Sequence, residues 1–245
     1  MPATATESPA HAAPRAGALN WVAAARMIDH TLLKPDATRE QVEKLCREAA
    51  HFDFASVCVN AYWVPLCAAM LRPTPVKVCT VIGFPLGATL TSAKRAEAVE
   101  VLRLGADELD MVMNVGALKS GDTGRVLADV RGVAEVAHEA GALLKVILEN
   151  VLLTREEKVL ACEICLAAGA DFVKTSTGFA SGGATAEDVA LMRSVAGQRA
   201  GVKAAGGIRT AEHFRAMVQA GADRIGCSAS VGILRQMGAP GFFKM

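Results

Sequence analysis

Three lysines interrupt apolar segments of the chain at places where a charged side chain is costly. Lys145 lies in "LKVIL", Lys174 in "ADFVKTS" and Lys203 in "GVKAAGG", and each segment otherwise has the composition of a buried strand. Lysine is depleted in strands and is almost never fully buried without a partner. A structural salt bridge would explain one such lysine, but three in successive segments indicate a shared site.

Buried lysines at neutral pH are suited to covalent amine catalysis. A lysine attacks a carbonyl only as the free amine, although its ordinary pKa is ~10.4. Desolvation and a neighbouring cation lower a lysine pKa, and Lys174 and Lys203, on consecutive predicted strands, can provide this repulsion for each other. The resulting Schiff base would stabilise a carbanion, and Asp110 with a bound water is the candidate proton shuttle. The alternative is that Asp110 only orients a lysine.

Two glycine-containing segments, "AAGGIRT" and "IGCSAS", follow the last two apolar runs and indicate an anion site. In α/β barrels the loops after the seventh and eighth strands commonly hold a phosphate on backbone N–H groups. One such turn is weak support, because glycines are common in turns, but the pair favours a phosphate. The candidate residues are Gly206, Gly207, Arg209, Gly226 and Ser228.

A recurring phrase predicts the elements that must position these residues. The segments "LGADELDMV", "AGALLKVIL", "AGADFVKTS" and "AGADRIGCS" each follow an amphipathic helical stretch and begin an apolar run. Each contains a glycine that we expect to end a helix in the left-handed conformation before a buried parallel strand begins. The four glycines are Gly105, Gly141, Gly169 and Gly221, and further strands are predicted at 27–31, 54–60, 76–84 and 201–207.

Eight strands, each followed by a helix, close most naturally into a (β/α)₈ TIM barrel, predicted here as a single domain over residues 18–245. Residues 1–17, rich in Ala, Pro and Thr, are predicted to be a disordered tail. An open doubly wound sheet is the alternative, but no G-x-G-x-x-G follows any strand. Strand alternation predicts that Asp110 shares a face with Asn114, and Lys145 with Glu149.

Composition argues against several classes of function. The net charge of +1 and an aromatic content of 4% provide no electrostatic footprint for nucleic acid or an anionic membrane. No segment approaches the roughly 20 apolar residues of a membrane span, so a soluble cytoplasmic protein is expected. Seven cysteines, an odd number, are typical of reduced thiols, and we interpret the C-x-x-C of Cys162 and Cys165 as helix packing.

The strand-end segments, taken together, resemble those of the deoxyribose-phosphate aldolases. They are "IDHTLL", "VCTVIGFPLGA", "GADELDMVMNVG", "LKVILE", "GADFVKTSTGF", "VKAAGGIRT" and "DRIGCSAS", in the family's order, over roughly residues 20–236. The resemblance implies a class I aldolase on a (β/α)₈ barrel, without metal or other cofactor and possibly homodimeric. The implied reaction is the reversible cleavage of 2-deoxy-D-ribose 5-phosphate to acetaldehyde and D-glyceraldehyde 3-phosphate.

By matching position, the resemblance makes Lys174 the Schiff-base lysine, Lys203 the neighbour that lowers its pKa, and Asp110 the group that moves protons through water. Asp29, Thr31 and Lys145 are implied contacts to the sugar hydroxyls. The other implied substrate-binding residues are Thr177, Gly178, Gly206, Gly207, Arg209, Gly226 and Ser228.

Ala229 departs from the family's pattern, which usually has a second serine after Ser228, so one hydroxyl near the phosphate is missing. If Cys58 reaches the barrel mouth, we also expect its thiol to trap a product derived from acetaldehyde. Three other functions stay open: a different Schiff-base aldolase, a phosphosugar isomerase, or a catalytically silent barrel that binds a sugar phosphate. An isomerase would more naturally use a glutamate or histidine base than paired lysines.

Overall fold

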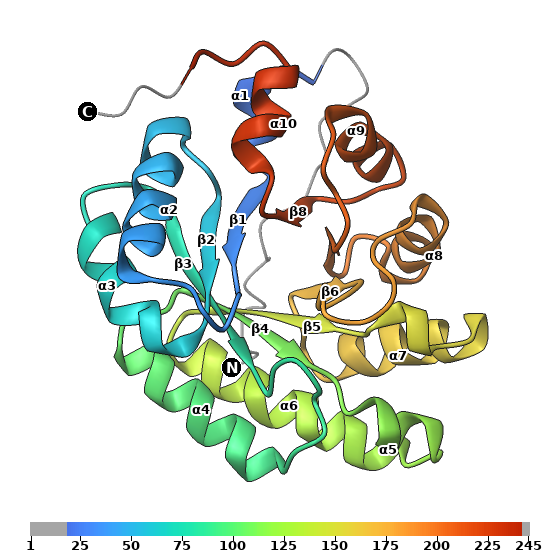
Figure 1. The fold of residues 1–245 in the computed structure, drawn as a ribbon. Coiled ribbons are helices and arrows are strands. Elements are labelled where there is room, and N and C mark those ends of the chain that lie inside the picture. The colour runs from blue at the N-terminus through green and yellow to red at the C-terminus, as the bar shows by residue number, and fades with distance from the viewer. Residues whose placement is uncertain (1–18, 242–245) are drawn as a thin grey trace, which may run out of the picture.

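The structure, a computed structural model, describes residues 19–241, so the predicted tail at 1–17 lies outside the described residues. Eight parallel strands form a closed barrel in chain order, and β1 pairs with both β2 and β8. This confirms the predicted TIM barrel (Figure 1). The strands are β1 Ile28–Leu32, β2 Ser56–Val59, β3 Lys77–Ile82, β4 Glu108–Val112, β5 Leu143–Ile147, β6 Phe172–Lys174, β7 Gly201–Ala205 and β8 Arg224–Cys227.

Helices surround the barrel and fill the connections between its strands (Figure 1). None of the helices in the described part of the chain is long and apolar enough to cross a membrane. The short α1, α5 and η2 were not expected from the sequence. The helices are α1 Trp21–Ala25, α2 Arg39–Phe52, η1 Ala61–Trp63, α3 Val64–Leu71, α4 Thr91–Arg103, α5 Val115–Lys119, α6 Thr123–Glu139, η2 Asn150–Leu152, α7 Arg155–Ala167, α8 Ala186–Ala196, α9 Ala211–Gln219 and α10 Ser230–Gln236.

The helix ends follow from local sequence. Thr38 caps α2 through a capping box with Gln41, which satisfies backbone N–H groups that the first turn leaves free. The four glycines predicted to end helices all have positive φ, between 72° and 109°. Such a conformation costs glycine little because it has no Cβ. The four glycines are Gly105, Gly141, Gly169 and Gly221.

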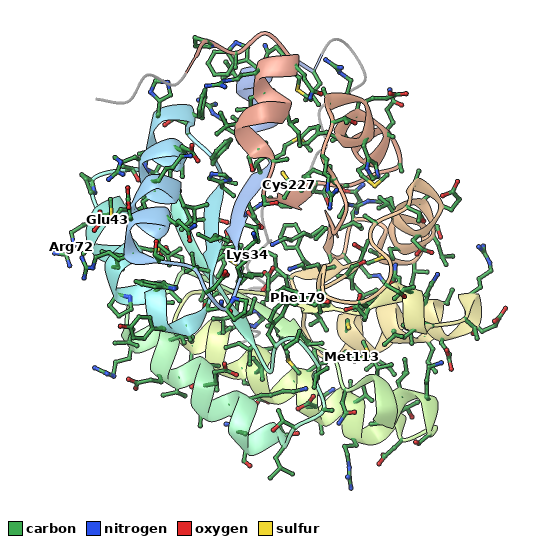
Figure 2. The ribbon with its side chains drawn as sticks, viewed as in Figure 1. Lys34, Glu43, Arg72, Met113, Phe179 and Cys227 are labelled. Carbon is green, nitrogen blue, oxygen red and sulfur yellow. The ribbon has the colours of Figure 1, made fainter. Side chains whose placement is uncertain are left out.

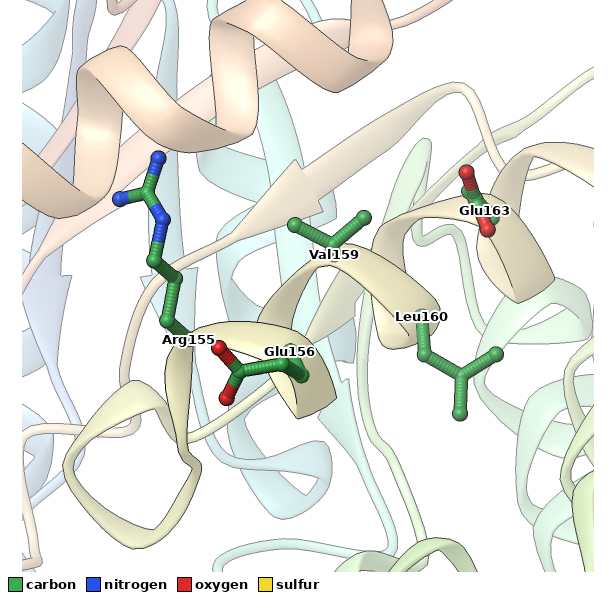
Figure 3. A pocket seen from close by; sticks show the side chains of 5 residues that line it. All are labelled: Arg155, Glu156, Val159, Leu160 and Glu163. Atoms are coloured by element: carbon green, nitrogen blue, oxygen red, sulfur yellow. The ribbon is translucent and has the colours of Figure 1, made fainter.

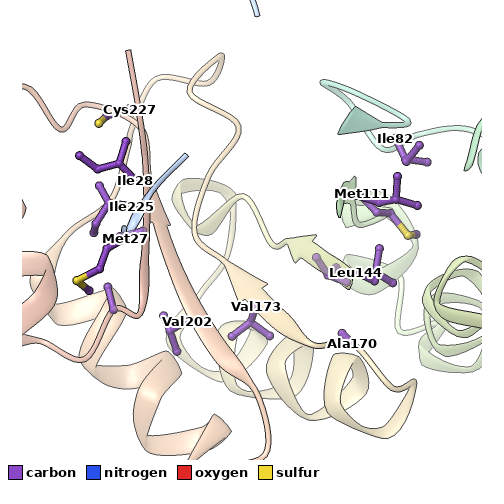
Figure 4. Packing of buried hydrophobic residues seen from close by; sticks show 14 of the residues in the cluster. Met27, Ile28, Ile82, Met111, Leu144, Ala170, Val173, Val202, Ile225 and Cys227 are labelled. Carbon is purple, nitrogen blue, oxygen red and sulfur yellow. The ribbon is translucent and has the colours of Figure 1, made fainter. Parts of the chain in front are cut away.

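The main core lies between the barrel and its helices. Outward side chains such as Met111, Leu144 and Val202 are fully buried there (Figure 4). The outward faces of the strands are apolar because the helices cover them. The cysteines of the C-x-x-C, Cys162 and Cys165, are free and buried on α7, which confirms that they pack in the core.

The barrel interior is divided between apolar and charged side chains. A separate apolar cluster of Leu33, Cys58, Cys79 and Val81 lies on the β2 and β3 side. Charged side chains on β1 and on β4 to β8 occupy the rest of the interior. These charges therefore lie inside the closed barrel, surrounded by its strands.

Candidate active site

Asp110 is the centre of the interior charges. Its Oδ2 accepts hydrogen bonds from Lys174 Nζ at 2.7 Å and from Lys203 Nζ at 2.6 Å. Its Oδ1 accepts one from Lys145 Nζ at 2.9 Å. These four residues lie on the consecutive strands β4 to β7, where Asp110 is in register with Lys145, and Lys174 with Lys203. The structure therefore brings the three predicted lysines and the predicted aspartate into one contact group.

A second set of charges packs against this group, and two of its members, Glu108 and Arg224, were not predicted. Glu108 lies 2.6 Å from Lys145 Nζ, and Arg224 bridges Glu108, at 2.8 Å, and Asp29. Asp29 also pairs with Lys203 at 2.5 Å. Alternation along β4, which puts Glu108 two residues before Asp110, was the available signal for Glu108. Arg224 carried no comparable signal.

Burial and charge act against each other on the carboxylates. Burial raises the pKa of Asp110, but Lys145, Lys174 and Lys203 outweigh it and hold that pKa well below its usual range. Burial likewise raises the pKa of Asp29, and its cationic neighbours lower it more strongly. Both groups are therefore carboxylates at neutral pH.

The same competition acts on the cations. Burial lowers the pKa of Lys203, but the carboxylates of Asp110 and Asp29 raise it more, so it lies above its ordinary value. The pKa of Lys145 is raised by Asp110 in the same way, against the effect of burial. Lys203 is thus a cation beside Lys174. Its positive charge is the one that is needed to repel an ammonium group on Lys174.

The charges in this interior do not balance. Three carboxylates, those of Asp29, Glu108 and Asp110, face four basic side chains. The basic side chains are Lys145, Lys174, Lys203 and Arg224. A buried excess of one cation is costly, and it disappears if one lysine is a neutral amine.

The loops after β6 and β7 come into close contact at glycines, whose lack of a side chain lets the two backbones approach. A Cβ on Gly206 would lie 3.0 Å from Gly183 Cα and 3.6 Å from Gly178 Cα. The backbone N–H of Ala184 donates to the Gly206 carbonyl at 3.1 Å. Gly178 and Gly207 are exposed and have positive φ. Three of the predicted phosphate-side positions thus lie on two loops in backbone contact.

The remaining predicted residues are placed differently. Thr31 donates its hydroxyl to the Asp29 carbonyl at 2.8 Å, and Arg209 and Ser228 are exposed. Gly226 lies within β8, where a Cβ would be 3.1 Å from Lys203 Cε, so this glycine leaves room for the lysine. Thr177 is buried and bonded to Glu149.

Two expectations about shared faces were wrong. Asn114 lies beyond the end of β4 and caps α5 by accepting from the Ala117 N–H, because strand alternation stops at Val112. Glu149 lies after β5 with a left-handed φ of 57°, so its side chain bonds to Thr177 rather than joining the lysine group.

Two thiols border the lysine group. The ligand atoms of Cys58, Cys79 and Asp110 lie within 4.8 Å of one another, and all three residues are buried. These groups could hold a soft metal ion by their spacing, but both Asp110 oxygens already accept hydrogen bonds from lysine side chains. A hydrogen bond from Cys79 lowers the pKa of Cys58, against the effects of burial and of Asp110. By its distance from Asp110, Cys58 lies beside the lysine group.

Two surface hollows lie away from the lysines. One, of about 340 Å³, is on α7 (Figure 3) and is lined by Arg155, Glu156, Val159, Leu160 and Glu163. The other, of about 750 Å³, is lined by Ala88, Thr89, Leu90, Thr91, Ser92, Asn114, Arg125 and Asp129. Neither hollow is lined by a residue of the charged interior. Phe179, in the loop after β6, lies inside the ring of helices in the view of Figure 2 and lines neither hollow. It packs edge-on against Phe84, with ring centroids 5.1 Å apart.

A closed barrel of eight parallel strands surrounded by helices places the chain in the class of (β/α)₈ barrels, and its interior holds the buried lysine group. The family model described as DeoC/LacD family aldolase matches residues 23–238. The chain belongs to this aldolase family and is accordingly an aldehyde-lyase.

Individual relatives agree with this assignment. A deoxyribose-phosphate aldolase of Brevibacillus brevis is 58% identical over 209 residues, covering 85% of this chain and 94% of the relative. Deoxyribose-phosphate aldolase 1 of Bacillus licheniformis is 56% identical over 215 residues, covering 88% and 96%. The solved structure of the Aeropyrum pernix deoxyribose phosphate aldolase, described as tetrameric, has a TM-score of 0.84 and 37% identity, covering 89% of this chain and 92% of that one.

Proposed function

We propose that this enzyme catalyses the reversible aldol cleavage of 2-deoxy-D-ribose 5-phosphate to acetaldehyde and D-glyceraldehyde 3-phosphate through a Schiff base on Lys174. The observation that carries the proposal is the buried group in which Lys174 and Lys203 lie on one oxygen of Asp110. Because this interior has one basic group more than it has carboxylates, a neutral Lys174 amine balances its charge. A neutral amine is the nucleophile that Schiff-base chemistry requires.

In the cleavage direction, the Lys174 amine attacks the C1 carbonyl of the open-chain sugar, and loss of water yields a protonated imine. A base then takes the proton of the C3 hydroxyl while the C2–C3 bond breaks. D-Glyceraldehyde 3-phosphate leaves, and the electron pair of that bond moves to the imine to form an enamine. Protonation of the enamine at C2 and hydrolysis by one water release acetaldehyde and the free Lys174 amine.

Asp110 is proposed to move the protons in these steps through a bound water. The neighbouring lysines hold its pKa well below the usual range against the effect of burial, so the group is ionised at neutral pH and can orient that water as a hydrogen-bond acceptor. Lys203 is proposed to remain a cation throughout, which its raised pKa supports. Asp29, Thr31 and Lys145 are proposed contacts to the sugar hydroxyls.

The phosphate is proposed to bind where the loops after β6 and β7 meet. Gly178, Gly206 and Gly207 have positive φ, and Arg209 is an exposed cation on the second of these loops. Ser228 is exposed at the end of β8, and Ala229 follows it without a hydroxyl. The resemblance also implies Thr177 and Gly226, which we propose shape the site without hydrogen-bonding the substrate, since Thr177 is bonded to Glu149 and Gly226 packs against Lys203.

Borohydride trapping tests the proposal. The protein is incubated with acetaldehyde and sodium borohydride, digested and mapped by mass spectrometry, and we expect a reduced N-ethyl adduct on Lys174. Lys94, also fully buried and ion-paired to Asp129 at 2.5 Å, is an internal control that should stay unmodified. The absence of an adduct on Lys174 would contradict the Schiff base.

The same experiment separates the alternatives. An adduct without turnover of 2-deoxyribose 5-phosphate would indicate a different aldol substrate. Isomerisation of a sugar phosphate without an adduct would indicate an isomerase, and binding without either would indicate a silent barrel.

We also propose that the enzyme works in the cytoplasm. All seven cysteines are free and buried, as expected for a protein in a reducing compartment. The homodimer that the resemblance implies is a prediction that light scattering would check.

A further inference from the structure

Glu149 combines two unfavourable features that the catalytic group does not require. Its side chain is buried, with 4% of the residue exposed, and its backbone has a φ of 57°. It is one of two described non-glycine residues with positive φ, the other being Asp53. A left-handed conformation is strained for a residue with a long side chain, and a buried carboxylate needs strong hydrogen bonds. Both features persist only where surrounding contacts compensate for them.

Thr177 supplies that compensation. Its hydroxyl donates to Glu149 Oε2, and its backbone N–H lies 3.3 and 3.4 Å from the two carboxylate oxygens. The same hydroxyl oxygen accepts the N–H of Phe179 at 3.0 Å. Within the described chain, every hydrogen bond to the Glu149 carboxylate comes from Thr177. We call this contact between Glu149 and Thr177 the β5–β6 clamp.

The clamp lies between the two parts of the proposed site, which are Lys174 and the glycine loops after β6 and β7. It holds the chain three residues after Lys174 and one residue before Gly178. Beyond it, the loop is docked on the turn after β7, where a Cβ on Gly183 would lie 2.4 Å from the Gly206 carbonyl oxygen. The clamp therefore fixes how the glycine loops lie relative to the lysine.

From this geometry we propose that Glu149 is a positioning residue that sets the preference of the enzyme for phosphorylated over unphosphorylated sugar. The inference rests on the proposed function, because it assumes that the glycine loops bind phosphate. While the clamp is closed, the hydroxyl proton of Thr177 is committed to Glu149 rather than to substrate. Loosening the clamp displaces the phosphate side from Lys174, whereas acetaldehyde, which has no phosphate, still reaches the amine.

The test compares kcat/KM for 2-deoxyribose 5-phosphate with kcat/KM for 2-deoxyribose. E149Q keeps the size of the side chain but replaces the charged acceptor of the Thr177 hydrogen bonds by a neutral amide, and T177V removes the hydroxyl at nearly constant volume. We expect the ratio of the two kcat/KM values to fall about tenfold in either variant, the size of effect typical of a lost hydrogen bond to a charged group. The double variant should fall no further, because both changes break the same contact.

Two further variants provide controls. T177S keeps the hydroxyl and should keep the wild-type ratio of the two kcat/KM values. S176A removes the neighbouring buried hydroxyl, which has no hydrogen-bond partner in the described structure, and should leave the ratio unchanged. Borohydride trapping of acetaldehyde on Lys174 should proceed at similar rates in all variants and shows that each one is folded.

Equal losses on both sugars in E149Q and T177V would overturn the inference, as would an unchanged ratio in both. Losses that add in the double variant would also contradict it, since they would show that Glu149 and Thr177 act separately. A wild-type protein without a Lys174 adduct would instead contradict the proposed function, so the two failures are distinguishable.

Discussion

Replacing Lys203 by methionine tests the electrostatic basis of the proposed nucleophile. Lys174 Nζ and Lys203 Nζ lie 2.7 and 2.6 Å from the same Asp110 oxygen, so the two nitrogens are no more than 5.3 Å apart. At an effective dielectric constant of about 20, two unit charges at that separation repel by about 3 kcal/mol. K203M removes this repulsion and also leaves Asp110 free to hold the Lys174 ammonium form more tightly.

Both consequences favour the ammonium form, so less free amine is available at neutral pH. A change of about 3 kcal/mol corresponds to roughly a hundredfold lower rate of acetaldehyde trapping at pH 7. Raising the pH favours the free amine, so the deficit should narrow as the pH rises. The assay is the initial rate of borohydride-trapped adduct on Lys174, followed by mass spectrometry at pH 7 and at a series of higher pH values.

Lys94 offers a matched control. It is as buried as Lys203 and is paired with Asp129 at 2.5 Å, but it lies on α4, outside the charged interior. K94M should lower stability, because it leaves a buried carboxylate without its partner, while the pH dependence of trapping stays that of the wild type. A K203M protein that traps acetaldehyde at the wild-type rate at pH 7, or whose deficit is the same at every pH, would refute the reasoning.

Three more outcomes are expected. Asp29 and Asp110 have depressed pKa values in the folded state, so the stability that they contribute is present above the unfolded pKa of ~3.9 and is lost as the pH falls through the folded values. In thermal unfolding, Tm should therefore decrease as the pH is lowered below about 5. A Tm that does not change in acid would contradict this. C58A should keep more activity than the wild type after incubation with excess acetaldehyde, because Cys58 borders the lysines, and equal inactivation of both proteins would remove that role. A229S should lower the KM for 2-deoxyribose 5-phosphate a few-fold, about the value of one added hydrogen bond, and an unchanged KM would exclude residue 229 from the phosphate contact.

Much of the fold could be predicted because its signals are local. The helix-ending glycines, the capping box at Thr38 and the apolar runs each depend on a few neighbouring residues. The lysines of the site could be predicted for the same reason, since a charge inside an apolar strand is conspicuous in the chain itself. Their grouping followed from alternation and from the order of the strands.

The partners of Glu108 and Arg224 could not be assigned in this way, although alternation alone places Glu108 on the same face as Asp110. Their contacts cross the barrel and join β4 to β8, which are 116 residues apart in the chain. Such a contact depends on how the sheet closes and on which layer of the interior each side chain reaches. Glu149 was misplaced because a positive φ after a strand has no sequence signal when the residue is not glycine.

By itself, the sequence determined the order of strands and helices, the apolar faces and the presence of lysines that require partners, because each of these is a property of short segments. Only the tertiary structure decided which partners they have. Closure of β1 against β8 brings Arg224 to Asp29, 195 residues away, and completes a network that has one basic group more than it has carboxylates. Charge balance in a buried interior is a property of all the side chains that meet there, so no single segment encodes it.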